Sequence, residues 1–227
     1  MSNESVRDLW ADRFGRPEPK IVCVGLNYKA HTGESGFEEP KAPLLFGKFA
    51  NTLLGDGDAI VLAPGVGHVD SEAELTVVIG ERASGVPEAS AMDVIAAYTC
   101  GNDVSAREAQ FADGQWFRGK SFDGFCPVGP TLVDASGFDP SDVRVVQRLN
   151  GEVLQDGRTR DLIFTIPVLV SYISQAITLE PGDLILTGTP EGVGFFRDPK
   201  LSMKDGDVVE VEVEGIGVLR NEVRAAT

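Results

Sequence analysis

Histidine, cysteine and positive charge are all scarce in this chain. Among its 227 residues there are two histidines and three cysteines, and 20 Lys and Arg stand against 35 Asp and Glu, which gives a net charge of −15 at pH 7. A chain this acidic is repelled by phosphate backbones, and no dense cluster of Lys and Arg offsets that repulsion. We therefore expect no nucleic-acid partner.

Long apolar runs are missing as well. None approaches the roughly 18 to 20 residues that a membrane-spanning helix needs, and the charged N-terminal stretch lacks the apolar segment of a secretory signal. We therefore expect no membrane partner and a cytoplasmic location. The cysteines are widely spaced in apolar surroundings, which favours buried, reduced thiols over disulfides or zinc ligands. They are Cys23, Cys100 and Cys126.

The common catalytic and nucleotide-binding signatures are also missing. The sequence contains no GxSxG, no phosphate-binding GxxxxGK[ST], no HExxH and no EF-hand loop. The glycine-rich stretch at residues 187–194 does not match GxGxxG, which disfavours a nucleotide cofactor.

What the chain does contain is a series of short apolar or alternating runs separated by Gly and Pro. These runs predict strands at residues 21–26, 59–62, 74–79, 131–133, 143–149, 184–187, 208–213 and 218–223, the last two as a terminal hairpin. Helices are predicted at residues 91–97, 105–112 and 166–174. Many strands, few helices and no regular βαβ alternation favour an α+β fold that is mostly β.

Two glutamates stand at the start of one predicted strand. Side chains alternate along a strand, so Glu72 and Glu74 share a face, with Cα atoms roughly 7 Å apart. Two carboxylates at that spacing can converge on one hard cation such as Mg²⁺, although a solvated edge strand explains the same pattern. Asp103 can supply a third carboxylate, or it can serve as a helix N-cap or turn residue.

Positive charge is rare enough here to single out where it clusters. Arg107, Arg118 and Lys120, with Gln110 among them, follow Asp103 closely in the sequence. An anionic substrate needs cations nearby, because the field of the whole protein is screened beyond about 8 Å at physiological salt.

Histidine is the side chain best suited to move protons near neutral pH. Glu34 lies three residues after His31, on the same side of a helical turn, where a carboxylate orients the imidazole. Gly33 and Gly36 favour a mobile segment, as a lid over a site would need. A surface His–Glu pair without a catalytic role remains the alternative.

Seven short motifs, taken in order, resemble the fumarylacetoacetate hydrolase family: VGLNYKAH (24–31), PLLFGK (43–48), DSEAEL (70–75), GNDVSAREAQ (101–110), FRGKSFDGFCPVGP (117–130), LNGEVLQDG (149–157) and LTGTPEGVG (186–194). The resemblance implies a β-roll with short peripheral helices. It also implies a short N-terminal segment at 1–19, a single catalytic domain at 20–227, a homodimer and a magnesium or manganese ion.

The same resemblance implies roles for nine residues. The metal ligands are Glu72, Glu74 and Asp103, the catalytic residues are His31, Glu34 and Lys120, and the substrate-binding residues are Arg107, Gln110 and Thr189.

These residues suit a small anionic 2-oxo acid as substrate. Such an acid, or its enol, can chelate the cation, and Lys120 would help to stabilise the enolate charge. With His31 as base for water, we favour hydrolysis of a C–C bond in an acylpyruvate-like 1,3-diketo acid. Decarboxylation or isomerisation of a dicarboxylic 2-oxo acid, oxaloacetate or 2-hydroxyhepta-2,4-diene-1,7-dioate, is the alternative. A more remote alternative is a protein that binds an organic acid without catalysing a reaction.

Overall fold

Strands dominate the computed structural model, which describes residues 3–226. Seven of them form one sheet in the order β2-β1-β12-β6-β7-β9-β3. Their bounds, in that order, are Leu44–Lys48, Ile21–Gly25, Leu184–Leu186, Ala73–Ile79, Ile95–Asn102, Cys126–Asp134 and Leu53–Leu54. Strand β6 pairs antiparallel with both of its neighbours, β12 and β7.

A second sheet has five strands in the order β11-β10-β13-β14-β4. Their bounds, in that order, are Glu152–Arg158, Arg144–Leu149, Val208–Val213, Gly217–Ala225 and Ala59–Leu62. A small separate sheet pairs β5 (Val69–Asp70) with β8 (Ser105–Ala106). The fold is α+β and mostly strands, as the sequence predicts, and β13 and β14 form the predicted hairpin.

The main core lies between the two large sheets and rests on the alternation along β6. Leu75, Val77 and Ile79 are fully buried there, together with Val211 from the second sheet. Val78 points the other way, into a second apolar cluster. Because β6 lies between two strands and both of its faces are covered, its polar residues are buried as well.

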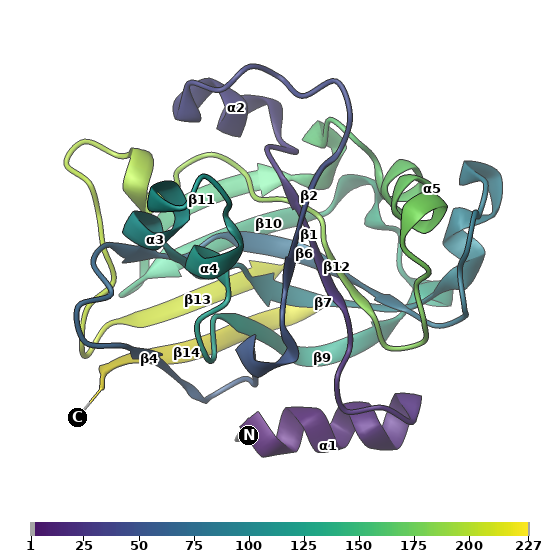
Figure 1. Ribbon diagram of the computed structural model, residues 1–227, viewed down its shortest axis with the longest axis horizontal. Helices are drawn as coiled ribbons and strands as arrows, with labels where there is room; N and C mark the ends of the chain where they lie inside the picture. The colour runs from purple at the N-terminus through teal and green to yellow at the C-terminus, as the bar shows by residue number, and fades with distance from the viewer. Residues whose placement is uncertain (1–2, 227) are drawn as a thin grey trace.

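Helices lie around the sheets (Figure 1). They are α1 (Asn3–Phe14), α2 (Lys29–Ser35), α3 (Arg107–Ala112), α4 (Phe117–Lys120) and α5 (Ile166–Ala176). Short 3₁₀ turns connect other elements: η1 (Ala50–Thr52), η2 (Glu88–Val94), η3 (Ala135–Gly137), η4 (Pro140–Asp142), η5 (Thr159–Asp161) and η6 (Gly194–Phe196). Helices α2, α3 and α4 gather at the top and left of Figure 1, far from α1. No helix in residues 3–226 is long and apolar enough to cross a membrane.

Helix α1 covers the outer face of the seven-stranded sheet. Its Trp10 is buried, and the indole Nε1 donates a hydrogen bond of 2.8 Å to the carbonyl oxygen of Gly182. The sequence pattern predicted no helix in this part of the chain. The division into a segment at 1–19 and a domain at 20–227 stays a prediction.

The helix predicted at residues 91–97 is wrong. The chain forms the 3₁₀ turn η2 as far as Val94 and then enters β7 at Ile95. A short apolar run fits the helical period and the strand period equally well. Here pairing with β6 and β9 stabilises a strand. The helix predicted at 105–112 likewise begins as β8 and becomes helical only at Arg107.

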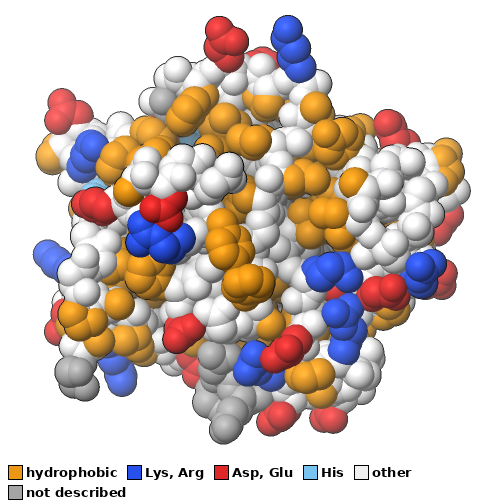
Figure 2. All heavy atoms as spheres, in the orientation of Figure 1, with side chains coloured by type: hydrophobic (Ala, Val, Ile, Leu, Met, Phe, Trp, Pro, Cys, Tyr) orange, Lys and Arg blue, Asp and Glu red, His pale blue; other side chains and the backbone are white. Residues whose placement is uncertain are grey.

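The surface carries both exposed charged side chains and some exposed apolar side chains. Figure 2 shows hydrophobic side chains gathered in the middle of one face, with charged groups mainly around them. Leu44, Phe49 and Phe117 are 40%, 64% and 41% exposed, and the last two rings are 4.8 Å apart. All three cysteines are buried, as the sequence predicts, and none of them is paired in a disulfide.

Candidate metal centre and active site

Strand pairing brings the three predicted metal ligands together. Glu74 lies on β6, Glu72 directly precedes that strand, and Asp103 directly follows β7, which pairs antiparallel with β6. The amide of Asp103 donates to the carbonyl oxygen of Glu72 at 2.9 Å. One carboxylate oxygen from each of the three residues lies within 4.8 Å of the others, and all three are buried.

The alternative explanations for these acids do not hold. Strand β6 is internal rather than a solvated edge strand. Helix α3 begins at Arg107 with Ala106 at its N-cap, so Asp103 caps no helix there. Buried carboxylates need compensating charge or a metal ion, so the cluster requires a partner of positive sign.

Two lysines supply part of that charge. Lys120 Nζ donates to Glu72 Oε2 and to Asp103 Oδ2, each at 2.7 Å. Lys48 Nζ, fully buried at the end of β2, donates to the other oxygen of Asp103. Lys48 was not among the residues predicted from the sequence, although it stands at the end of the short apolar run Leu44–Lys48.

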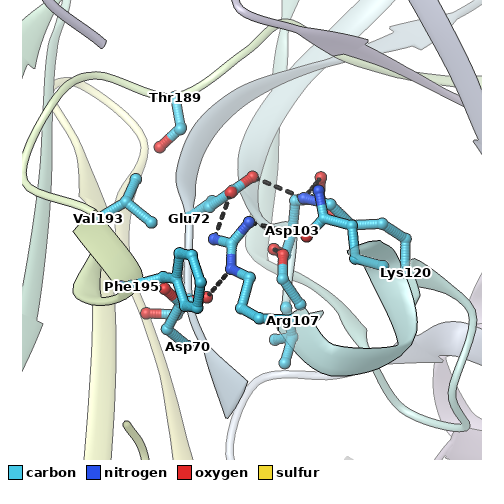
Figure 3. A network of polar contacts seen from close by, with 12 residues as sticks. Asp70, Glu72, Asp103, Arg107, Lys120, Thr189, Val193 and Phe195 are labelled. Carbon is cyan, nitrogen blue, oxygen red and sulfur yellow. Dashed lines mark hydrogen bonds and ion pairs between the residues drawn. The ribbon is translucent and has the colours of Figure 1, made fainter. Parts of the chain in front are cut away.

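Arg107 supplies the third positive charge. Its Nη2 donates to Glu72 Oε1 at 2.6 Å, its Nη1 to Gln110 Oε1 at 2.9 Å and its Nε to Asp70 Oδ1 at 2.7 Å. Figure 3 shows the guanidinium between Asp70 and Glu72, with Lys120 beyond them beside Asp103. By contrast, the structure places Arg118 outside this network, where its half-exposed side chain pairs with Asp113.

The charges leave one carboxylate uncompensated. Burial opposes ionisation of Glu72, but Lys120 and Arg107 outweigh it and hold its pKa well below the usual range. For Glu74, burial and the neighbouring charges of Asp103 and Glu72 raise the pKa well above the usual range. The only hydrogen-bond donor to Glu74 in the described residues is the amide of Gly188, at 2.6 Å.

The net charge of this network indicates whether a metal ion fits. With all four buried carboxylates ionised, counting Asp70, the three cations of the network would leave one net negative charge, which is the charge that the raised pKa of Glu74 opposes. A divalent cation at Glu72, Glu74 and Asp103 would turn this into one net positive charge. An all-carboxylate set of oxygen donors suits a hard cation such as Mg²⁺ or Mn²⁺. The residues therefore fit a divalent metal ion, which would favour the enolate form of a bound 2-oxo acid.

The predicted His31–Glu34 pair forms as expected, but on a helix. The segment is α2, which is followed by Gly36 as its C-cap with a φ of 72°, whereas the sequence favoured a mobile segment. His31 Nδ1 lies 2.8 Å from Glu34 Oε1. A carboxylate only accepts, so Nδ1 carries the proton and Nε2 is left as the basic nitrogen.

The loop that carries Thr189 is fixed by the strands beneath it. Gly188 has a φ of 104°, and a Cβ there would lie 2.7 Å from that of Asn27, so only glycine fits. The Thr189 hydroxyl donates to the carbonyl oxygen of Ala73 at 2.9 Å and accepts from Gln155 Nε2 at 2.8 Å. Both bonds commit this hydroxyl within the protein, so Thr189 shapes the site more than it offers a donor.

One small cavity is lined by most of the predicted site residues. Its polar lining is His31, Glu72, Glu74, Asp103, Arg107, Gln110, Lys120 and Thr189. Aromatic side chains also line it: Phe37, Phe46, Phe111, Trp116 and Phe196. Glu34 does not line the cavity and instead lies behind His31.

A sequence model described as fumarylacetoacetate (FAA) hydrolase C-terminal matches residues 20–224. The chain belongs to the fumarylacetoacetate hydrolase family. A Bos taurus relative named as a mitochondrial oxaloacetate tautomerase is 46% identical over 211 residues, which cover 92% of this chain and 67% of the relative. The chain thus spans about two thirds of that protein's length.

Solved structures of the fumarylacetoacetate hydrolase family share this fold. A 5-carboxymethyl-2-hydroxymuconate delta-isomerase from Mycobacterium smegmatis superposes with a TM-score of 0.83 at 45% identity, covering 92% of this chain and 79% of that one. A 2-hydroxyhepta-2,4-diene-1,7-dioate isomerase from Mycobacterium marinum gives 0.81 at 43% identity, covering 91% and 74%. These three relatives are named tautomerase or isomerase rather than hydrolase.

Proposed function

We propose that this protein is a metal-dependent tautomerase or isomerase of a dicarboxylic 2-oxo acid, and that oxaloacetate is the first substrate to test. The sequence left decarboxylation or isomerisation of such an acid as the alternative and favoured hydrolysis of an acylpyruvate. The names of the relatives support the alternative, since they describe an oxaloacetate tautomerase and isomerases of unsaturated dicarboxylic acids.

The observation that carries this proposal is the position of a single base. His31 lines the same cavity as the three carboxylates, and its Nδ1 is held by Glu34. Keto–enol interconversion needs one group that moves a proton to or from the carbon next to the carbonyl, and positive charge at the enolate oxygen. Hydrolysis would require in addition a positioned water.

The remaining residues would bind and orient the substrate. Arg107 and Gln110 line the cavity and are bonded to each other, so together they would receive a carboxylate of the substrate. Lys120 Nζ, held between Glu72 and Asp103, would stabilise negative charge that develops on the oxygen of the 2-oxo group. His31 Nε2 would take the proton from the neighbouring carbon and deliver it to the oxygen of the 2-oxo group to form the enol, with the two transfers reversed in the other direction.

The decisive experiment compares two substrates with one protein. Oxaloacetate enriched in its enol form is followed by ultraviolet absorbance, with Mg²⁺ or Mn²⁺, in the presence and absence of protein. We expect faster decay of the enol than with metal alone, and loss of that gain in Lys120→Met. Hydrolysis of an acylpyruvate without any acceleration of enol decay for oxaloacetate would overturn the proposal and support the hydrolase hypothesis.

Three further expectations from the sequence stay predictions. The preferred metal is proposed to be Mg²⁺ or Mn²⁺. A homodimer is proposed, which sedimentation at micromolar concentration would test. A cytoplasmic location remains the expectation, although the Bos taurus relative is named as mitochondrial.

A further inference from the structure

Asp70 is a buried carboxylate that neither the metal cluster nor the proposed proton transfer uses. It is 2% exposed, does not line the cavity, and lies outside the group of three acids that can hold a metal. Its Oδ1 accepts from Arg107 Nε at 2.7 Å, and its Oδ2 accepts from the backbone amide of Phe195 at 2.6 Å. Helix α3 and turn η6, far apart in the sequence, thus meet at one side chain (Figure 3).

On one side, Asp70 fixes the plane of the Arg107 guanidinium. A guanidinium has five N–H groups. Three of them donate to acceptors among the described residues, Asp70, Glu72 and Gln110, and one remains on each terminal nitrogen for a ligand. Because the guanidinium is planar, the bond to Nε restrains the plane in which the two terminal nitrogens face the cavity.

On the other side, Asp70 anchors the segment 192–196, which in turn holds the base. The amides of Gly192 and Val193 donate to Glu34 at 2.9 and 3.4 Å, and Glu34 holds His31. The ring of Phe196 also packs edge-on against that of His31, with centroids 5.8 Å apart. One end of the segment is therefore bonded to Asp70 and the other to the His31–Glu34 pair.

We propose that Asp70 is a positioning residue that holds Arg107 and, through the segment 192–196, the His31–Glu34 pair in one fixed arrangement. The proposal rests on the proposed function, because it takes Arg107 as the substrate-binding group and His31 as the base. Asp70 itself touches neither substrate nor metal.

The variant that tests this is Asp70→Asn. Asparagine keeps the size of the side chain but has one acceptor oxygen and an NH₂ donor in place of two acceptors. The NH₂ must face either Arg107 Nε or the Phe195 amide, so one of the two anchors is lost. We expect kcat/KM to fall about 10- to 100-fold, the range for residues that orient ligands of a site, with unchanged Mn²⁺ affinity.

A matched control is available in Asp183→Asn. Asp183 is also fully buried, and it accepts from Arg16 Nη1 at 2.9 Å and from the amide of Lys20 at 2.8 Å, but it does not line the cavity. We expect this variant to lose stability while it keeps kcat/KM. A comparable loss of kcat/KM in both variants would mean that Asp70 is merely structural.

A double-mutant cycle with Arg107→Lys separates positioning from stability. Lysine has no Nε–H donor at that place, so the part of the Asp70→Asn loss that acts through Arg107 should not add in that background. Fully additive losses, together with unchanged hydrogen exchange at 192–196, would overturn the proposal.

Hydrogen exchange gives a readout that needs no substrate. The amides of 192–196 and α2 should exchange faster in Asp70→Asn than in the parent, with β6 unchanged, when the Phe195 anchor is the one that is lost. If the parent protein fails to act on oxaloacetate, the proposed function fails while this measurement still decides the role of Asp70. If Asp70→Asn does not fold, Asp70→Glu, which displaces both acceptors by one methylene, carries the same readouts.

Discussion

Glu72 and Glu74 have the same spacing along the chain as Glu210 and Glu212 on β13, yet the molecule surrounds the two pairs in opposite ways. The first pair is 6% and 2% exposed and meets Asp103. The side chains of the second pair are 27% and 37% exposed, beside surface arginines. Both faces of β6 are covered, whereas β13 alternates buried valines with glutamates that reach solvent.

The difference shows that a charged residue at every second position does not by itself define a site. What distinguishes this region is that strands and helices from elsewhere cover it and bring Arg107 and Lys120 to Glu72, and Lys48 to the neighbouring Asp103. Burying a charge is costly unless it is paired, while exposed ion pairs contribute about 0 to 1 kcal/mol. Substitutions of the buried acids are therefore expected to change activity and stability more than substitutions of the exposed glutamates on β13.

The sharpest test of this comparison lies within the buried pair. Both Glu72→Gln and Glu74→Gln should abolish metal-dependent activity, because each removes one of three carboxylates. In metal-free protein the two substitutions should change the free energy of unfolding differently. Glu72→Gln breaks buried ion pairs and should lower the free energy of unfolding by about 3 to 5 kcal/mol, whereas Glu74→Gln replaces a carboxyl group whose ionised form has no compensating charge and should not lower it.

Urea denaturation in the presence of a chelator measures this difference. In Glu74→Gln the amide of Gly188 can still donate to the side-chain carbonyl oxygen that replaces the carboxylate, so no donor is left unpaired. Equal destabilisation by both substitutions would mean that Glu74 is compensated and that the charge count is wrong.

The second-largest effect is expected from replacing the proposed base, His31. General-base help is worth about 10²- to 10⁴-fold in rate, so His31→Ala should lose that much enol–keto conversion and keep its metal affinity. Glu34→Gln should lose less, since the ring stays but its orientation by the carboxylate weakens. Steady-state rates and Mn²⁺ titration of the two variants check both statements, and an unchanged rate in His31→Ala would remove this residue from the mechanism.

Metal binding should also be visible in stability alone. At a concentration 100 times its dissociation constant, a metal that binds only the folded state adds about 2.7 kcal/mol. For a chain of this length that corresponds to a rise in Tm of roughly 5 to 10 °C. Thermal unfolding with chelator and then with Mg²⁺ or Mn²⁺ measures the shift, and Glu74→Gln should show none. The same shift in Glu74→Gln would place the metal elsewhere.

The sequence allowed much of this site to be predicted, because its polar residues occur in short ordered motifs. Glu72, Glu74 and Asp103 meet as a consequence of one antiparallel strand pair, and a strand pattern makes such a meeting foreseeable. His31 and Glu34 are close in sequence and so could be paired by spacing alone.

Other features could not be predicted for the converse reason. Lys48 and Asp70 act through partners 55 and 37 residues away, so only the folded chain shows their contacts. Residues 95–102 were missed as a strand because alanine, tyrosine and cysteine in a short run fit a helix equally well. Pairing with β6 and β9, a tertiary effect, settled that segment.

The smallest effect is expected on the exposed strand, and it completes the comparison. Glu212 pairs with Arg148 at 2.7 Å, but the two side chains are 37% and 25% exposed, so water screens the pair. Glu212→Gln should therefore change the free energy of unfolding by less than about 1 kcal/mol, without altering activity or Mn²⁺ affinity. Urea denaturation and the enol–keto assay check this, with Glu72→Gln as the buried counterpart. A loss as large as that of Glu72→Gln would show that covering by other elements is not what separates the two strands.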